Sequence, residues 1–288
     1  MRPVLVDSLN SYFKTTLFHW LVPELAVVYT AAILVCLLVF VRRTKQSGLS
    51  EFHAWGAALV GLLAGIIGTR AWYLLMNWRD VSQHPSLIYE LNGPTVSFGA
   101  YLFGSAAFIA YLAWKKQPIL RYLDTYASCL GLGPMIARWS CFLNGDDYGT
   151  ITAVPWAVRY PPGSYPFVDH VNQGLINVMA DHSLPVHPVQ VYLSLKGLLL
   201  FLVCSYLWRH ANFRPGVLFG VFWALYALLR FGIEFFRGDP TIHYWHSFTY
   251  GQVVCIFIFV IAVFYLLVLN LVTNSAKHTL TEIRPLQS

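Results

Sequence analysis

The chain has 288 residues, of which 57% are hydrophobic and only 11% are charged. A soluble domain rarely has this composition, and the mean hydropathy of +0.56 predicts a chain embedded in lipid. The formal net charge of +6 is read as a topology signal, because the sequence holds no basic and aromatic patch typical of nucleic-acid binding.

Apolar runs bounded by charged residues predict the membrane spans. Each run has roughly the 20 residues that a helix needs to cross a bilayer. The first twenty residues lack the pattern of a cleaved signal peptide, so the first span is expected to direct membrane insertion. We expect an all-α polytopic membrane protein in which residues 1–288 form a single integral membrane domain with about seven transmembrane helices. The spans are expected at roughly 20–41, 52–77, 96–114, 122–143, 188–208, 215–236 and 251–273.

Basic residues collect in alternate connections between these spans. The connections after the first, third, fifth and last spans hold ten Lys and Arg residues, and the other connections with the N-terminal tail hold five. Because basic loops stay in the cytoplasm, the N-terminus is predicted outside and the C-terminus inside. The longest connection, residues 145–187, then lies outside, between spans four and five. Its many Pro, Gly and aromatic residues predict a structured external cap.

Charged residues inside the spans are the first candidates for a site, since each is costly in lipid unless it finds a partner or water. Lys196 and Asp124 lie near enough to span ends to reach the surface or to pair locally. Arg70 lies deep in IIGTRAWYLL and is either a structural partner of an acidic residue or part of a site. The complete set is Arg70, Asp124, Arg138, Lys196, Arg230 and Glu234.

The sixth span carries a polar stripe. Tyr226, Arg230, Glu234 and Arg237 follow one another at spacings of four, four and three, so they share one helix face. An ion pair between Arg230 and Glu234 within the helix would explain two of these residues. It would leave Tyr226 on the same face unexplained, whereas Arg237 alone would serve as an interfacial anchor.

A second cluster, ARWSCFLNGDDYG at 137–149, places Arg138 deep in the fourth span. Asn144 and Gly145, followed by two acids, are typical of a turn, but an exit turn does not explain the buried arginine. Arg138 and Arg230, facing one polar interior, predict a site for a buried anion. The planar guanidinium suits phosphate, and in a membrane the obvious phosphate belongs to a phospholipid headgroup.

A third cluster, LPVHPVQVYLSL at 184–195, opens the fifth span. It places His187 and Gln190 three residues apart at the outer mouth, where polar groups are equally compatible with an interfacial position. Taken alone, this cluster indicates no particular chemistry.

Together the clusters resemble the bacterial prolipoprotein diacylglyceryl transferase family. The resemblance runs through SFGAYLFG, ARWSCFLNGDDYG, PWAVRYP, LPVHPVQVY, FGVFWALYALLRFGIEFFR and GQ, in that order. Its most specific parts are the His-Pro-x-Gln-x-Tyr run and the Tyr-x3-Arg-x3-Glu-x2-Arg helix. The resemblance implies a seven-span enzyme of the bacterial inner membrane with its N-terminus outside. Such an enzyme moves the diacylglyceryl group of phosphatidylglycerol to the lipobox cysteine thiol in the signal peptide of a preprolipoprotein and releases glycerol phosphate, without a metal or cofactor.

The charges within the spans and the resemblance together give the candidate site residues. The catalytic candidates are Arg138, Arg230, Glu234, Asp146 and His187. The candidates for substrate binding are Asn144, Gly149, Tyr226, Gln190, Arg237, Arg70 and Tyr101.

Three positions depart from the family pattern. Cys141 and Asp146 stand where the best-known members have Asn and Glu, and Gly99 stands where some members have a histidine. The base for the thiol therefore stays open among Asp146, Glu234, His187 and the phosphate itself. Cys141 is disfavoured as a covalent nucleophile, because a thiol buried among apolar residues is hard to ionise.

Two other functions fit parts of the sequence. A divergent membrane paralogue would bind a phospholipid headgroup or modify a different acceptor, and the three departures support it. A small-solute transporter would also use charges within the membrane. The lack of internal repeats and the position of the polar motifs near the outer ends of spans argue against the transporter.

Overall fold

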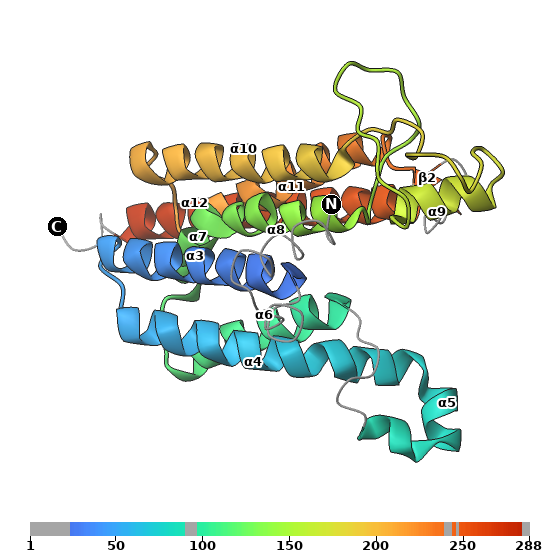
Figure 1. Ribbon diagram of the computed structural model, residues 1–288. Coiled ribbons are helices and arrows are strands. Elements are labelled where there is room, and N and C mark those ends of the chain that lie inside the picture. The colour runs from blue at the N-terminus through green and yellow to red at the C-terminus, as the bar shows by residue number, and fades with distance from the viewer. Residues whose placement is uncertain (1–23, 90–96, 239–243, 246–247, 284–288) are drawn as a thin grey trace, which may run out of the picture. The chain divides into compact units, whose positions relative to one another are not determined.

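The computed structural model describes residues 24–89, 97–238, 244–245 and 248–283. Over these residues the chain is almost wholly helical, with one short antiparallel pair of strands, β1 (Tyr244–Trp245) and β2 (Phe248–Thr249). The helices are α3 (Glu24–Gln46), α4 (Glu51–Met76), α5 (Trp78–Gln83), η1 (Pro85–Ile88), α6 (Ser97–Trp114), α7 (Ile119–Leu130), α8 (Leu132–Asn144), α9 (Tyr165–Asn172), α10 (Val189–His210), α11 (Val217–Glu234) and α12 (Tyr250–Ile283) (Figure 1).

Five of the helices in the described residues are long and apolar enough to cross a membrane, namely α3, α4, α10, α11 and α12. α6 is a shorter apolar helix. Their positions agree with six of the expected spans, so the chain is a multi-pass helical membrane protein.

The run expected to form the fourth span, residues 122–143, is not a single helix in the structure. Two helices, α7 and α8, occupy this run and meet at Gly131. A Cβ atom at Gly131 would lie 2.5 Å from the carbonyl oxygen of Gly197 in α10, and one at Gly197 would lie 2.6 Å from the backbone nitrogen of Met135. The two glycines therefore let the backbones of α8 and α10 touch, as small residues do between membrane helices.

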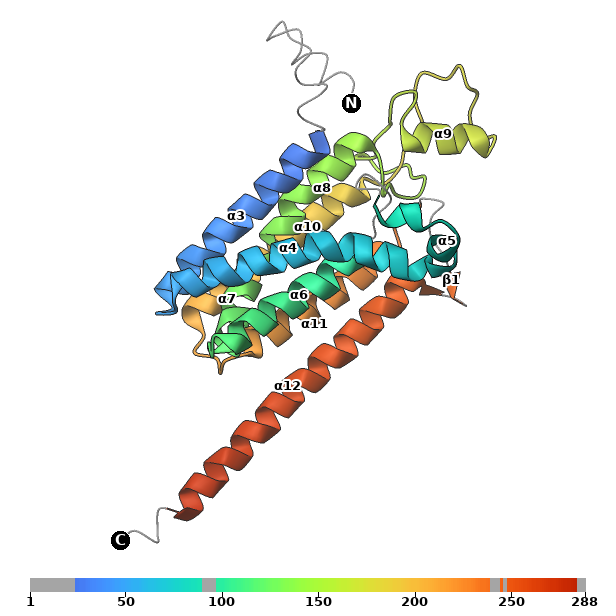
Figure 2. The ribbon, with the colours of Figure 1, turned by 90° about the horizontal axis from the view of Figure 1, so that it is seen from below.

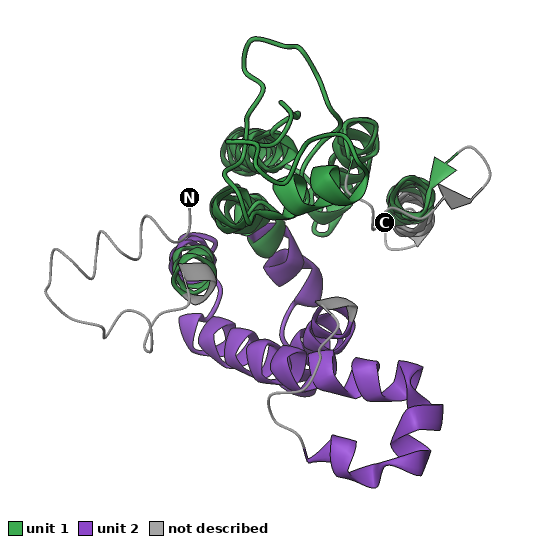
Figure 3. Ribbon diagram, turned by 45° about the vertical axis from the view of Figure 1, so that its right-hand side comes forward, with its two compact units in different colours: residues 1–36, 126–288 green, residues 37–125 purple. Residues whose placement is uncertain are grey.

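The chain divides into two compact units, residues 1–36 with 126–288 and residues 37–125 (Figure 3). The single membrane domain expected from the sequence stays a prediction. Within the second unit, α4 and α6 pack closely through glycines: a Cβ atom at Gly68 would lie 2.6 Å from the carbonyl oxygen of Gly99. A side chain at Gly99 would in turn overlap the carbonyl of Gly68. Gly99, which stands where some family members have a histidine, therefore allows α4 and α6 to pack closely in this chain.

In the first unit, α8, α10 and α11 pack side by side and α12 packs on α11. A buried core of this unit contains Ala127 of α7, Leu200 and Cys204 of α10, and Leu218 and Phe222 of α11. Figures 1 and 2 show α9 and its loops at the end of this unit where α10 begins and where α8 and α11 end.

Residues 145–187 are ordered around a small core of their own. Tyr148, Tyr160 and Val186 are buried together, and Val158 and Val186 exchange backbone hydrogen bonds. The buried His170 accepts a hydrogen bond at Nδ1 from the N–H of Leu184, at 3.2 Å. The segment therefore has a fixed structure, and its external position stays a prediction.

Candidate functional site

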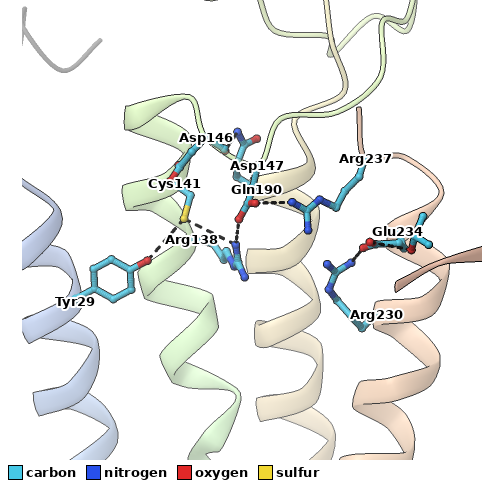
Figure 4. Close-up of polar contacts among 10 residues, drawn as sticks. Tyr29, Arg138, Cys141, Asp146, Asp147, Gln190, Arg230, Glu234 and Arg237 are labelled. Carbon is cyan, nitrogen blue, oxygen red and sulfur yellow. Dashed lines mark hydrogen bonds and ion pairs between the residues drawn. The ribbon is translucent and has the colours of Figure 1, made fainter. Parts of the chain in front are cut away.

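The turn after α8 positions the acidic pair that follows it. Gly145 takes a left-handed conformation with φ of 82°, and its N–H donates to the carbonyl of Cys141. Asp147 also has a positive φ, of 55°, which Asp and Asn tolerate better than most residues. The turn predicted from Asn-Gly is present, and it directs the Asp147 carboxylate back towards α8 (Figure 4).

Asp147 joins two arginines from different parts of the chain. Nη1 of Arg138 lies 2.6 Å from one carboxylate oxygen, and Nη2 of Arg237 lies 2.7 Å from the other (Figure 4). The side chain of Asp147 is 31% exposed, so solvent screens these contacts only in part. The structure thus brings Arg138 and Arg237 together through a carboxylate that the sequence indicated only as part of a turn.

Arg230 forms an ion pair with Glu234 one helical turn later, as the intrahelical alternative predicts. The Glu234 side chain is 3% exposed, and its Oε1 accepts a hydrogen bond from Oγ1 of Thr249 at 3.1 Å. Thr249 and Gln252 exchange backbone and side-chain hydrogen bonds in a capping box at the start of α12. Both oxygens of Glu234 are therefore engaged, and Arg230 is fixed beside the N-terminus of α12.

Asp146 lies next to this arrangement. Its backbone carbonyl accepts a hydrogen bond from Nε2 of the fully buried Gln190, at 2.7 Å, and Asn144 stabilises its carboxylate through the side chain. Oδ1 of Asp146 is buried and has no hydrogen-bond partner among the residues that the structure describes. Burial, and then the charge of Asp147, raise the pKa of Asp146 above its usual value. This carboxyl is the best placed of the predicted bases to accept a proton.

His187 is less available than Asp146. Its Nδ1 lies 3.0 Å from the hydroxyl of Tyr192, which accepts a hydrogen bond from Nε1 of Trp156 at 2.7 Å. The ring also packs edge-on against Phe236, with centroids 5.1 Å apart. These residues line a largely apolar pocket of about 690 Å³. His187 thus belongs to the wall of an apolar pocket, and among the residues that the structure describes no hydrogen bond joins its side chain to a carboxylate of the arginine cluster.

Gly149 holds the end of the site together through its backbone. Its N–H donates to the carbonyl of His187, at 3.0 Å. A Cβ atom there would lie 2.5 Å from that carbonyl oxygen and 2.7 Å from the carbonyl oxygen of Phe236. The glycine is required because three backbone segments meet at this point.

Tyr226 contacts a cation that the sequence indicated only as a residue near a span end. The ammonium of Lys196 lies 3.9 Å from the centre of the Tyr226 ring. The Tyr226 ring also stacks on Phe222 and meets Trp223 edge-on. Lys196 is buried, at 5% exposure. Lys196 and Asp147 therefore contact predicted site residues, although neither was assigned to the site from the sequence.

Arg70 and Tyr101 belong to the other compact unit and are described with it. The guanidinium of Arg70 donates to the carbonyl of Leu87 and lies 5.3 Å from the centre of the Tyr73 ring. Tyr101, on α6, is 74% exposed. Their predicted contacts with a substrate stay predictions.

The comparisons with known proteins agree with these motifs. The model of the family described as prolipoprotein diacylglyceryl transferase matches residues 16–268. A protein from Clostridium tetani (strain Massachusetts / E88) is 28% identical over 208 residues, which are 72% of this chain and 78% of that protein. One from Symbiobacterium thermophilum (strain DSM 24528 / JCM 14929 / IAM 14863 / T) is 31% identical over 232 residues, 79% of each chain. Both relatives are named phosphatidylglycerol–prolipoprotein diacylglyceryl transferase.

Proposed function

The chain belongs to the prolipoprotein diacylglyceryl transferase family, and from this premise we propose how its residues perform the transfer. The protein is a transferase that moves the diacylglyceryl group of phosphatidylglycerol to a prolipoprotein. The acceptor atom is the thiol sulfur of the lipobox cysteine, and the released product is glycerol phosphate.

The convergence of Arg138, Arg230 and Arg237 at one end of the helices carries this proposal. The arginines bind the phosphodiester of phosphatidylglycerol, because guanidinium forks match phosphate oxygens in pairs and stay charged. Their existing contacts with Asp147 and Glu234 hold the three side chains in place before the lipid arrives. Such fixed cations stabilise charge where it develops in the transition state.

The bond changes follow from this placement. The thiol loses its proton to the carboxylate of Asp146, and the sulfur attacks the glyceryl carbon that carries the phosphate. A carbon–sulfur bond forms as the carbon–oxygen bond breaks, and the electron pair stays on the phosphate oxygen. The thioether remains on the prolipoprotein and glycerol phosphate leaves. Asp146 suits the role of base because its raised pKa brings it closer to that of a thiol.

The transfer is testable with purified protein in detergent. A lipobox peptide thiol is expected to gain a diacylglyceryl group from phosphatidylglycerol, and glycerol phosphate is expected in equal amount. Phosphatidylethanolamine is expected to serve poorly, because its headgroup brings a cation towards the arginines. A peptide with serine in place of the cysteine controls for non-specific acylation, since an alkoxide is much harder to generate than a thiolate. A folded chain that binds phosphatidylglycerol without forming the thioether would support the lipid-binding paralogue instead.

The membrane arrangement belongs to the same proposal. The chain crosses the bacterial inner membrane seven times, with α7 and α8 together as the fourth crossing and α6 as the third. The N-terminus is outside, the C-terminus is cytoplasmic, and residues 145–187 cover the arginine cluster from the outer side. The ten basic residues in the predicted cytoplasmic segments, against five elsewhere, support this orientation.

Single cysteines at Ser164 and Ser47 in a cysteine-free chain test the orientation. An impermeant thiol reagent applied to intact cells is expected to label position 164 and to spare position 47. Labelling of both positions after the cells are broken controls for accessibility of each thiol. The reverse pattern in intact cells would invert the proposed topology.

A further inference from the structure

Lys196 is a buried cation that the mechanism above leaves without a role. It lies in α10, seven residues after the helix begins, and is 5% exposed. Among the residues that the structure describes, no carboxylate forms an ion pair with it. Its ammonium rests on the face of Tyr226, 3.9 Å from the ring centre. A cation–π contact offsets only part of the cost of burying an ammonium, so a further anionic partner is expected.

The surroundings of Lys196 indicate where that anion binds. The ammonium is close enough to Arg230 and Arg138 to interact electrostatically with both. Both arginines are already paired with carboxylates, through Glu234 and Asp147. Lys196 in α10 therefore lies within electrostatic range of Arg138 in α8 and Arg230 in α11. Like charges disfavour one another, so this arrangement suits a site where an anionic ligand neutralises them.

The balance of charge at the site changes with Lys196. Once Asp146 has taken the thiol proton and is neutral, Arg138, Arg230 and Arg237 against the carboxylates of Asp147 and Glu234 leave one positive charge. One positive charge matches the single negative charge of a phosphodiester. The glycerol phosphate that leaves is a monoester, which carries about −1.5 to −2 near neutral pH. Lys196 raises the positive charge of the site to two, which matches the product and the transition state that leads to it.

We propose that Lys196 is a fourth phosphate-binding cation of the transfer reaction, which contacts the leaving phosphate as its second negative charge develops. The inference rests on the proposed function and deepens it. As the carbon–oxygen bond breaks, the electron pair moves to the phosphate oxygen, and the ammonium donates a hydrogen bond to that phosphate. The thiol proton still goes to Asp146, so Lys196 takes no part in the proton transfer.

This role predicts a specific kinetic signature. Lys196→Met and Lys196→Gln are expected to lower kcat by about 100-fold, as removal of one donor to a developing anion does. The KM for phosphatidylglycerol is expected to change by less than about threefold, because the guanidiniums of the arginines still bind the diester oxygens. Inhibition by added glycerol phosphate is expected to weaken by about tenfold or more. Lys196→Arg keeps the charge and is expected to stay within about tenfold of wild type.

Lys45→Met is the matched control, because Lys45 is an exposed lysine of α3 that pairs with Glu51. Its kinetics are expected to equal those of wild type. Insertion and melting temperature in detergent show whether each variant folds. A folded neutral variant with a kcat above about one third of wild type would overturn the inference. So would a folded Lys196→Arg protein as slow as Lys196→Met, or unchanged inhibition by glycerol phosphate.

The experiments distinguish a failure of the proposed transfer reaction from a failure of the proposed role of Lys196. If wild-type protein transfers nothing to the peptide, the transfer itself is refuted. The shift in melting temperature on addition of glycerol phosphate then decides the inference for wild type and Lys196→Met. Stabilisation of the wild type alone would support Lys196 as a phosphate-binding cation, and equal stabilisation of both proteins would overturn it. If the wild type is active but neither neutral variant inserts, folded Lys196→Arg decides the inference: a rate within about tenfold of wild type supports it, and a slower rate overturns it.

Discussion

Replacing Asp147 with asparagine removes the carboxylate that joins two arginines without changing the shape of the turn. Asparagine tolerates the left-handed conformation of this position, with φ of 55°. The carboxylate contacts Arg138 at 2.6 Å and Arg237 at 2.7 Å. Breaking a buried ion pair by removing one partner costs about 3–5 kcal/mol, and an exposed pair is worth about 0–1 kcal/mol. Because the three side chains are 17–31% exposed, we expect a loss of about 2–3 kcal/mol in unfolding free energy.

Asp147→Asn is expected to lower kcat and not to raise KM. The guanidiniums lose the group that orients them, so kcat is expected to drop by about 30- to 100-fold, which corresponds to about 2–3 kcal/mol. The KM for phosphatidylglycerol is not expected to rise, because the site gains one net positive charge. The assay is transfer to the lipobox peptide, together with denaturant unfolding in detergent.

Asp181→Asn is the control for this experiment. It makes the same substitution at an exposed residue of the segment 145–187, and it is expected to behave as wild type in both assays. An Asp147→Asn protein with wild-type stability and wild-type kcat would refute the idea that Asp147 organises the arginines. A higher KM with unchanged kcat would also refute it, because that result would place the carboxylate in lipid binding alone.

Three further predictions concern the arginines, the position of the family histidine and the cap. Arg138→Ala and Arg230→Ala are each expected to lower the transfer rate by about 100-fold or more in protein that still inserts. Lysine at either position is expected to restore little activity, because a point charge lacks bidentate contact. Wild-type transfer rates in both alanine variants would contradict the role of these arginines. Gly99→His is expected to lower the melting temperature by blocking the close packing of α4 on α6, whereas Gly232→His, at a position with open space, is expected to fold; equal melting temperatures would argue against this packing. Burial lowers the pKa of His170, so the unfolded cap takes up the proton first and the stability of the cap falls as pH drops below about 6.5. Proteolysis of residues 145–187 is therefore expected to be faster at acidic pH, and His170→Asn is expected to abolish this acceleration. A pH-independent rate of proteolysis in wild type would contradict the prediction.

Much of the helical fold is predictable from apolar runs alone. The expected spans at 52–77, 96–114 and 188–208 differ from α4, α6 and α10 by at most two residues at either end. Charges and turn residues bound these runs, so composition locates the helix ends. The division of the fourth run at Gly131 is not predictable in this way, because it depends on contact with Gly197, more than sixty residues later. A glycine in an apolar run carries no sign of the backbone that it will touch.

Asp147 and Lys196 show that contacts between charged residues far apart in the sequence are equally hard to predict. Asp147 lies in the turn that begins with Asn144 and Gly145, and a place in a turn is enough to explain an acidic residue. Its contact with Arg237, ninety residues later, cannot be predicted from the sequence. The position of Lys196 near a span end predicts a lysine that reaches the surface or pairs locally. Seven helical residues, however, rise about 10 Å, which is farther than a lysine side chain extends. Its distance from the helix start was therefore a usable signal. Its neighbours Arg138 and Arg230 were not predictable without the helix packing.

The ion pair between Arg230 and Glu234 does not exclude a role for Arg230 in catalysis. A self-neutralising pair explains why both charges are tolerated in an apolar helix. Glu234, however, is itself bound by Thr249 at the capped start of α12, so the pair is fixed to a second helix. A guanidinium held in this way loses little further side-chain entropy when phosphate binds, and it needs no reorganisation as charge develops. The pairing that looks purely structural in one helix is therefore what preorganises Arg230 for an anion.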